Sequence, residues 1–95
     1  MMTQQEERLH LRILAPTSVI FDGQVDSVSA ENHVGSFDVL PGHTNFFTLL
    51  SGEIVQANEL GRPLTFNVQR GIMKVHDNVV VVYANIGSVH EKAIA

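Results

Sequence analysis

The sequence predicts an all-β domain, a flattened sandwich or barrel of about ten short strands. Apolar residues alternate with polar ones over short stretches, and turn-forming pairs interrupt the chain every few residues. No segment has the apolar period of a helix. Hydrophobic residues make up 44% of the 95 residues, too many for a disordered chain. We therefore expect one domain over residues 9–87, with a disordered tail at 1–8 and a short tail at 88–95.

The first half of the chain is expected to form five strands separated by turn signals. Pro16 and Thr17 end the first strand, because proline cannot donate to a ladder. Asp22 and Gly23 form a turn pair that is expected to end the second strand. The strands expected here are Leu9–Ile13, Val19–Phe21, Val25–Ala30, one around Phe37, and Phe46–Leu50, with a loop over Glu31–Gly35.

The segment around Phe37 contains the clearest strand and break. Phe37 and Val39 fall on one face of a strand and Ser36 and Asp38 on the other, which is the period of a half-buried strand. The following Pro-Gly-His triplet, residues 41–43, interrupts the ladder and allows a turn. We expect His43 to lie at a corner between two strands.

The second half of the chain continues the same pattern. Asp77 and Asn78 should form a tight turn with positive φ at both positions. The apolar run Val79–Ala84 should be buried on both sides, or face a second sheet on one side and a partner on the other. Residues 86–95 are expected to be a tail, with a helix that Ser88 can cap. The other segments expected here are the strands Glu53–Ala57, Arg62–Val68 and Ile72–Val75, and a hairpin turn at Asn58–Gly61.

Composition argues against several classes of function. The chain has no cysteine, so a disulfide scaffold, a thiol nucleophile and a thiolate metal site are excluded. A net charge of −4 with six scattered Lys and Arg argues against a nucleic-acid partner. The polar, acidic start has neither signal-peptide nor transit-peptide character. The longest apolar run is too short to span a bilayer as a helix, so membrane association is expected only through a partner.

No motif predicts catalysis, a cofactor or a metal. The five histidines lack the spacing of metal ligands. Ser36, Asp38 and His43 are the residue types of a hydrolase triad, but Ser36 lies within a strand and not at a nucleophile elbow. Gly35 and Gly42 precede no helix and no lysine, so they are expected to be turn residues and not a phosphate loop.

Phe46 and Phe47 are adjacent aromatic residues, and at most one of them is expected to be exposed. Adjacent residues of a strand point to opposite faces, so one ring should lie inside the sandwich and the other outside it. A strand buried on both faces is the alternative. An exposed Phe47 would be an aromatic contact for a protein partner.

Several pieces of the chain resemble, in order, the N-terminal β-sandwich domain of the epsilon subunit of F-type ATP synthases. They cover nearly the whole chain, and the Pro-Gly-His corner after a strand is the most specific of them. The matching pieces are Leu11-Arg12-Ile13 with Ala15-Pro16, Phe21-Asp22-Gly23 with Val25 and Val28, Gly35-Ser36-Phe37, Leu40-Pro41-Gly42-His43, Leu49-Leu50, Gly52-Glu53-Ile54, Gly71-Ile72-Met73-Lys74-Val75, and Asn78 to Val82.

The resemblance implies a non-catalytic rotor component of the central stalk. In that family the sandwich rests on the membrane-embedded c-ring, packs against the gamma subunit, and helps to couple ion-driven rotation to the shaft. It also implies a peripheral location on the cytoplasmic face of a bacterial inner membrane. The residues expected to contact the c-ring or gamma are Glu31, His33, Val34, Gly35, Ser36, Pro41, Gly42, His43, Phe47 and Thr48.

The chain departs from the family pattern at several positions. Ser36 stands where an acidic residue is common, Gln69 and Arg70 replace a small pair, and Asn85 replaces a common Asp. The chain also stops soon after the sandwich, without the usual C-terminal helical hairpin. We therefore expect neither helical inhibition nor nucleotide binding from these residues. A free-standing β-barrel module that binds a small ligand or another protein is the alternative function.

Overall fold

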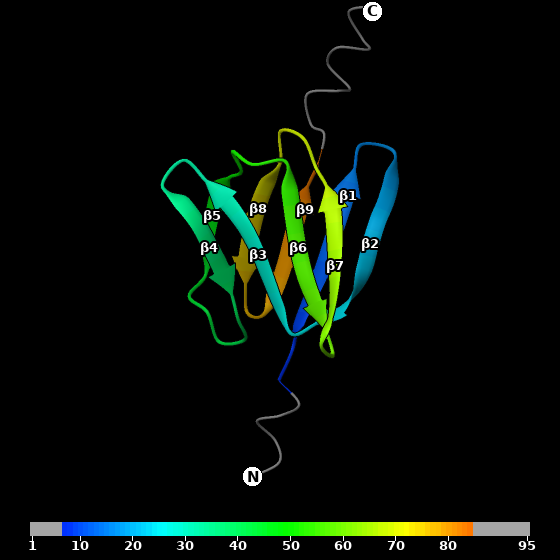
Figure 1. The fold of residues 1–95 in the computed structure, drawn as a ribbon, viewed down its shortest axis with the longest axis vertical. Helices are drawn as coiled ribbons and strands as arrows, with labels where there is room; N and C mark the ends of the chain where they lie inside the picture. The colour runs from blue at the N-terminus through cyan, green and yellow to red at the C-terminus, as the bar shows by residue number, and fades with distance from the viewer. Residues whose placement is uncertain (1–6, 85–95) are drawn as a thin grey trace, which may run out of the picture.

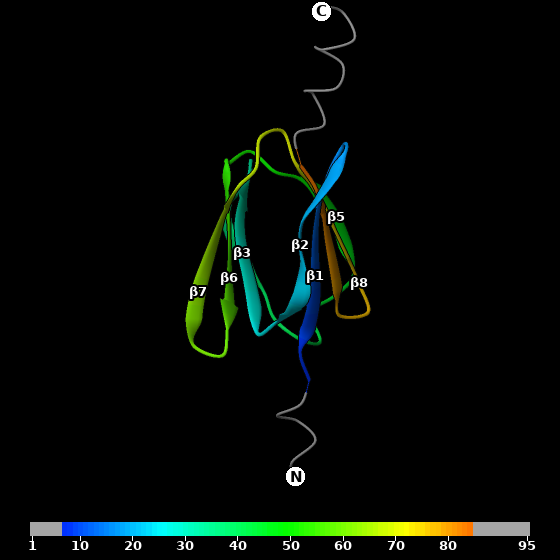
Figure 2. The same cartoon turned by 90° about the vertical axis from the view of Figure 1, so that its right-hand side faces the viewer.

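Two β-sheets stacked face to face make up the part of the chain that the structure describes (Figures 1 and 2). The structure is a computed structural model, and it describes residues 7–84. Within that range it contains nine strands and no helix, so the predicted sandwich is confirmed with one strand fewer than about ten. The strands are β1 (Leu9–Ala15), β2 (Ser18–Val25), β3 (Ser27–Asn32), β4 (Gly35–Val39), β5 (Phe46–Leu49), β6 (Ile54–Glu59), β7 (Arg62–Asn67), β8 (Ile72–His76) and β9 (Val79–Tyr83).

The strand order places the first and last strands side by side. The five-stranded sheet has the order β2-β1-β9-β8-β5, and the four-stranded sheet has the order β4-β3-β6-β7. Strands β1 and β9 are parallel, whereas the other paired strands are antiparallel. A parallel pair needs a crossover connection, and here the seven strands between β1 and β9 supply it.

The core fills the space between the two sheets. Every fully buried side chain among the described residues is apolar. Two aromatic pairs lie at the open sides of the sandwich, Phe21 with Phe66 between β2 and β7, and Phe37 with Phe46 between β4 and β5. The buried residues are Leu9, Leu11, Ile13, Val25, Val28, Ala30, Val39, Leu50, Val55, Ala57, Val68, Met73, Val75, Val80, Val82 and Ala84.

The turn predicted at Asp22 and Gly23 is wrong. Strand β2 runs through both residues, because Asp22 pairs with Arg12 and Gly23 pairs with Leu11 in the ladder with β1. The ring of Phe21 folds over Gly23, so that a Cβ at this position would lie 3.1 Å from Cζ of Phe21. Gly23 is therefore a site of close packing within a strand and not a turn residue.

The loop predicted over Glu31–Gly35 is also shorter than expected. Glu31 pairs with Ser36 and Asn32 pairs with Gly35, so β3 and β4 form a hairpin whose turn is only His33 and Val34. The side chain of Asn32 stabilises this turn, because its Oδ1 accepts hydrogen bonds from the backbone amides of Val34 and Gly35.

The turn predicted between the last two strands is confirmed. Asp77 has φ 50° and Asn78 has φ 66°, the left-handed values that a two-residue hairpin turn of this type requires. The predicted tails and the helix at Ser88 fall wholly or mainly outside the described residues.

Candidate partner interface

The outer faces of the two sheets differ in chemistry. The outer face of the four-stranded sheet presents mainly small polar side chains, including Ser29, Gln56 and Thr65, which lie beside one another across β3, β6 and β7. Its carboxylate Asp38 accepts a hydrogen bond of 2.7 Å from Ser29. This face has the polar character of a solvent-facing sheet surface.

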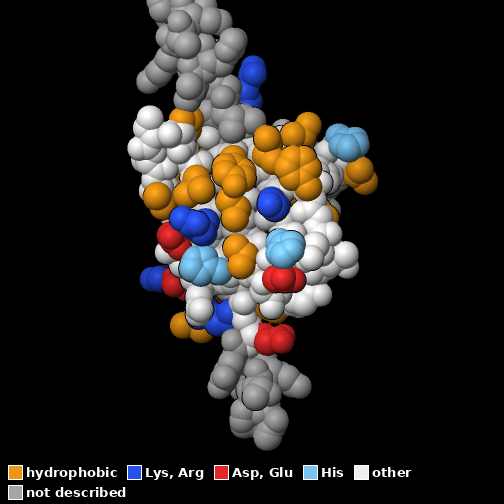
Figure 3. Space-filling model, turned by 180° about the vertical axis from the view of Figure 1, so that it is seen from behind, with side chains coloured by type: hydrophobic (Ala, Val, Ile, Leu, Met, Phe, Trp, Pro, Cys, Tyr) orange, Lys and Arg blue, Asp and Glu red, His pale blue; other side chains and the backbone are white. Residues whose placement is uncertain are grey.

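The outer face of the five-stranded sheet carries an uninterrupted apolar row. Leu49, Ile72, Tyr83, Leu14 and Val19 are register neighbours on β5, β8, β9, β1 and β2. Leu49 is 63% exposed, Val19 59% and Tyr83 43%. Figure 3 shows the hydrophobic side chains gathered toward one end of this face. At about 4.8 Å per strand, the apolar row spans roughly 19 Å.

Two further rows lie parallel to the apolar row and become progressively more polar. The mixed row holds Phe47, Lys74, Val81, Arg12 and Asp22 in register. The histidine row holds His76, Val79, His10 and Gln24. Hydrophobicity therefore falls along the strand direction, from the end where β9 finishes toward the Asp77–Asn78 turn.

A groove of about 390 Å³ follows β8 and β9 across these rows. Val79, Val81 and Tyr83 supply the apolar part of its lining, and Lys74, His76 and Asp77 supply the polar part. An open groove with this lining fits an apolar protein surface that carries a few polar groups.

The carboxylate of Asp22 joins two basic side chains of β1 on this face. Nε2 of His10 donates to Oδ1 of Asp22 at 2.5 Å, and Nε of Arg12 lies 3.4 Å from Oδ2. The hydrogen bond from His10 holds the pKa of Asp22 below its ordinary value of 3.8. Partial desolvation opposes this effect, and the charges of His10 and Arg12 add to it.

The variant Asp22→Asn should reduce the pH dependence of stability in acid. Because the folded-state pKa of Asp22 is lowered, its contribution is complete above the pKa of the unfolded carboxyl and is lost as the pH falls through the lower folded-state pKa. Urea unfolding between pH 7 and pH 2 measures the difference between wild type and variant. The difference should shrink below about pH 4. A constant difference over this range would contradict the assignment.

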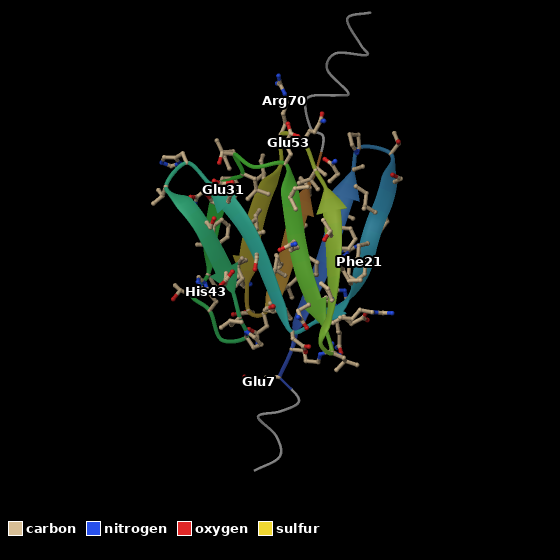
Figure 4. The ribbon with its side chains drawn as sticks, viewed as in Figure 1. Glu7, Phe21, Glu31, His43, Glu53 and Arg70 are labelled. Atoms are coloured by element: carbon tan, nitrogen blue, oxygen red, sulfur yellow. The ribbon has the colours of Figure 1, made fainter. Side chains whose placement is uncertain are left out.

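Most of the predicted contact residues lie near the two ends of β4, whereas Phe47 and Thr48 lie on β5. The hairpin turn that includes His33 and Val34 is at one end of the sandwich, and the Pro-Gly-His corner is at the other, with β4 between them. Figure 4 shows Glu31 and His43 near these opposite ends. A partner that touches both groups must therefore extend along the side of the sandwich formed by β4 and β5.

Two hydrogen bonds join the segment around the Pro-Gly-His corner to the β8–β9 turn. Oδ1 of Asn78 accepts a 2.7 Å hydrogen bond from the amide of Gly42, and Oδ1 of Asn45 accepts one of 2.9 Å from the amide of Asp77. Gly42 has φ 86°, and the His43 ring lies 5.2 Å from the Phe46 ring. The sequence analysis did not predict that the side chains of Asn45 and Asn78 join these two segments. Asparagine beside a predicted turn could have indicated it, because its side chain often accepts hydrogen bonds from backbone amides there.

The first three residues of β5 alternate between its two faces. Phe46 is half-buried against the core, whereas Phe47 is 64% exposed on the outer face. The alternative in which β5 is buried on both faces is thus wrong. Thr48 accepts a 3.1 Å hydrogen bond from Nδ2 of Asn32 on β3, so its side chain points toward the other sheet.

Within residues 7–84 no group of three or more His, Asp or Glu side chains is placed to hold a metal ion. Of the residue types that suggested a triad, Asp38 pairs with Ser29, and Nδ1 of His43 lies 2.9 Å from the carbonyl oxygen of Thr44. What the described residues do provide is the exposed apolar row on the outer face of the five-stranded sheet.

Fold and surface together define a β-sandwich domain in which one outer face is mainly polar and the other carries an apolar row. The chain belongs to the family of the ATP synthase delta/epsilon chain, β-sandwich domain, which matches residues 8–87. The prediction of this family from the sequence is therefore confirmed.

Curated relatives agree with this assignment. The chain is 35% identical to the ATP synthase epsilon chain of Trichlorobacter lovleyi over 77 residues, which covers 80% of this chain and 55% of the relative. It is 32% identical to that of Gloeobacter violaceus over 83 residues, or 84% of this chain and 63% of the relative. The chain thus spans little more than half of the length of these relatives.

Solved structures share the fold. A chain of the Euglena gracilis mitochondrial ATP synthase, solved as OSCP, F1 and c-ring, matches with a TM-score of 0.76 and 19% identity over 93% of this chain and 62% of that one. A chain of the Tetrahymena thermophila mitochondrial ATP synthase central stalk and c-ring matches with a TM-score of 0.67 and 15% identity, covering 80% and 62%. Among the described residues, no helix has the length and apolar character needed to cross a membrane.

Proposed function

We propose that this chain is a non-catalytic rotor subunit of the central stalk of an F-type ATP synthase. It holds the gamma shaft on one side and rests on the c-ring, so that ion-driven rotation of the ring reaches the shaft. It works on the cytoplasmic face of a bacterial inner membrane and associates with that membrane only through the complex. These residues take no part in the chemical steps of catalysis and bind no nucleotide.

The apolar row on the five-stranded sheet is the observation that carries this proposal. The largest contiguous apolar surface on a small domain is often functional, and it commonly marks a contact with another protein. The opposite face is polar, which favours one partner-bearing side over a sandwich enclosed on both sides. The family membership then favours the gamma shaft as the partner on this face.

The outer face of the five-stranded sheet is too small to form the whole contact with a partner. Two rows across five strands and one across four project an area of roughly 300 Å², whereas a stable obligate contact buries about 1,000 Å² or more on each partner. The turns at the two ends of β4 are available to supply the remainder. We therefore propose that Phe47 and the residues Glu31, His33, Val34, Gly35, Ser36, Pro41, Gly42, His43 and Thr48 lie in or beside the contacts with gamma and the c-ring.

Transmission of torque requires a body that does not flex between its two contacts. Ladder hydrogen bonds join the strands within each sheet, and a filled apolar core holds the two sheets together. The reciprocal asparagine hydrogen bonds join the Pro-Gly-His corner to the β8–β9 turn. Force applied at the corner can thus reach the five-stranded sheet through packed groups and not through a loose loop.

The test is direct binding to the gamma subunit of the ATP synthase of the same organism. We expect the purified chain to co-elute with gamma in size-exclusion chromatography, and the complex to be retained on detergent-solubilised c-ring. A chain that stays monomeric beside gamma would contradict the proposal. Binding of a small metabolite by that monomer would instead favour the free-standing module.

A further inference from the structure

Lys74 is a cation among apolar neighbours on the outer face of the five-stranded sheet. Its register neighbours are Phe47 on β5 and Val81 on β9. None of the ion pairs within residues 7–84 includes Lys74, although Arg12 and His10 on the same face share Asp22. Because Lys74 is also exposed, its ammonium group is solvated by water in the isolated chain.

A partner that covers this face changes the environment of Lys74. The groove along β8 and β9 has Val79, Val81 and Tyr83 in its lining beside Lys74, so a protein seated on them also covers the lysine stem. Burial of an unpaired ammonium is strongly unfavourable, whereas an opposing carboxylate offsets the lost hydration. Asp77 does not supply this carboxylate, because it lies at the turn with an oxygen 3.4 Å from Nδ1 of His76.

We infer that Lys74 forms an ion pair with a carboxylate of the protein seated in this groove, and that this pair fixes the register of the contact. The inference rests on the proposed function, which makes that protein the gamma shaft. The partner surface then has apolar side chains opposite Val79, Val81 and Tyr83 and an Asp or Glu opposite Lys74.

Charge complementarity supports an acidic partner surface. The chain as a whole carries a net charge of −4, yet the middle of this face presents Lys74 and Arg12 against the single carboxylate Asp22. Arg12 is already paired with Asp22, which leaves Lys74 as the cation available to a partner. The apolar row lies two residues further along the strands, so the partner carboxylate should sit about 7 Å from the most apolar part of the contact.

The experiment measures binding of the chain to gamma by titration calorimetry at low and moderate salt. The variants are Lys74→Glu, Lys74→Met and the control Arg62→Glu, which makes the same charge change on β7 beside Glu59. We expect Lys74→Glu to weaken binding at least tenfold, and Lys74→Met to weaken it several-fold and to reduce its salt dependence. Arg62→Glu should bind as wild type does. Circular dichroism of each isolated variant establishes that the fold is unchanged.

The outcomes separate the two proposals. If wild type binds gamma and Lys74→Met binds as tightly or more tightly, the ammonium is unpaired and this inference is overturned while the proposed function stands. If wild type does not bind gamma, the proposed function fails and the inference fails with it. Self-association of the chain through this face, abolished by Lys74→Glu, would assign the surface to a second copy and would also overturn the inference. Restoration of Lys74→Glu binding by a charge-reversed gamma carboxylate would identify the paired residue.

Discussion

Leu11→Ala is expected to lower the free energy of unfolding by about 2 to 5 kcal/mol, the range for removing a fully buried leucine side chain. Leu11 is completely buried on β1, between β2 and β9. Its partner on β2 is Gly23, which has no side chain to fill the space left behind. Ladders on both sides of β1 hold the backbone in place, so the cavity can collapse only partly.

This loss is large for a domain of this size. Small domains are stabilised by roughly 5 to 10 kcal/mol, so the variant should unfold at much lower urea concentration and melt roughly 10 to 40 °C below wild type. Leu49→Ala is the matched control, because it removes the same atoms from a side chain that is 63% exposed. The control should change stability by no more than about 0.5 kcal/mol. Equal losses in the two variants would contradict the assignment of inner and outer faces.

Residues whose local pattern and tertiary contacts agree could be placed from the sequence. Phe37 and Val39 alternate with Ser36 and Asp38, and the structure packs the first two against the core side and exposes the other two. The Asp-Asn turn was also predictable, because few residue pairs accept positive φ at both positions. In each case the residues of a single short segment were enough to predict its local structure.

Residues whose environment is set by a distant strand could not be placed in this way. Asp22 and Gly23 have strong turn propensity, but pairing with β1 and the ring of Phe21 keep them in a strand. At such sites the hydrogen bonds of the ladder and side-chain packing outweigh the local turn propensity.

The apolar row could not be predicted from the sequence for a related reason. Its five members come from five strands, and they align only once the register of each pair is known. The parallel pairing of β1 with β9 brings together the two ends of the described chain, and no local pattern encodes it. The sequence did indicate that Phe47 and one side of β9 could face a partner, which is the part of the surface that strand alternation alone can predict.

Phe47→Asp is expected to abolish most of the binding to gamma while the isolated chain stays folded. Phe47 is 64% exposed and lies beside Lys74 on the outer face, so an aspartate there remains hydrated when no partner is present. In a complex that covers this face the carboxylate would be desolvated and an aromatic contact would be lost. Loss of an aromatic contact that carries much of the binding energy costs about 2 to 4 kcal/mol, so we expect binding at least roughly 30-fold weaker.

The neighbouring residue supplies the contrasting variant. Phe46 packs against the core and lies 5.7 Å from Phe37 and 5.2 Å from His43 between ring centroids, so Phe46→Asp should unfold or strongly destabilise the isolated chain. Urea unfolding and gamma titration of both variants distinguish the two roles. Adding His43→Ala to Phe47→Asp should weaken assembly further, because the corner is a proposed second contact. If Phe47→Asp alone unfolds the isolated chain, Phe47 belongs to the core, and the partner surface must be sought on another face.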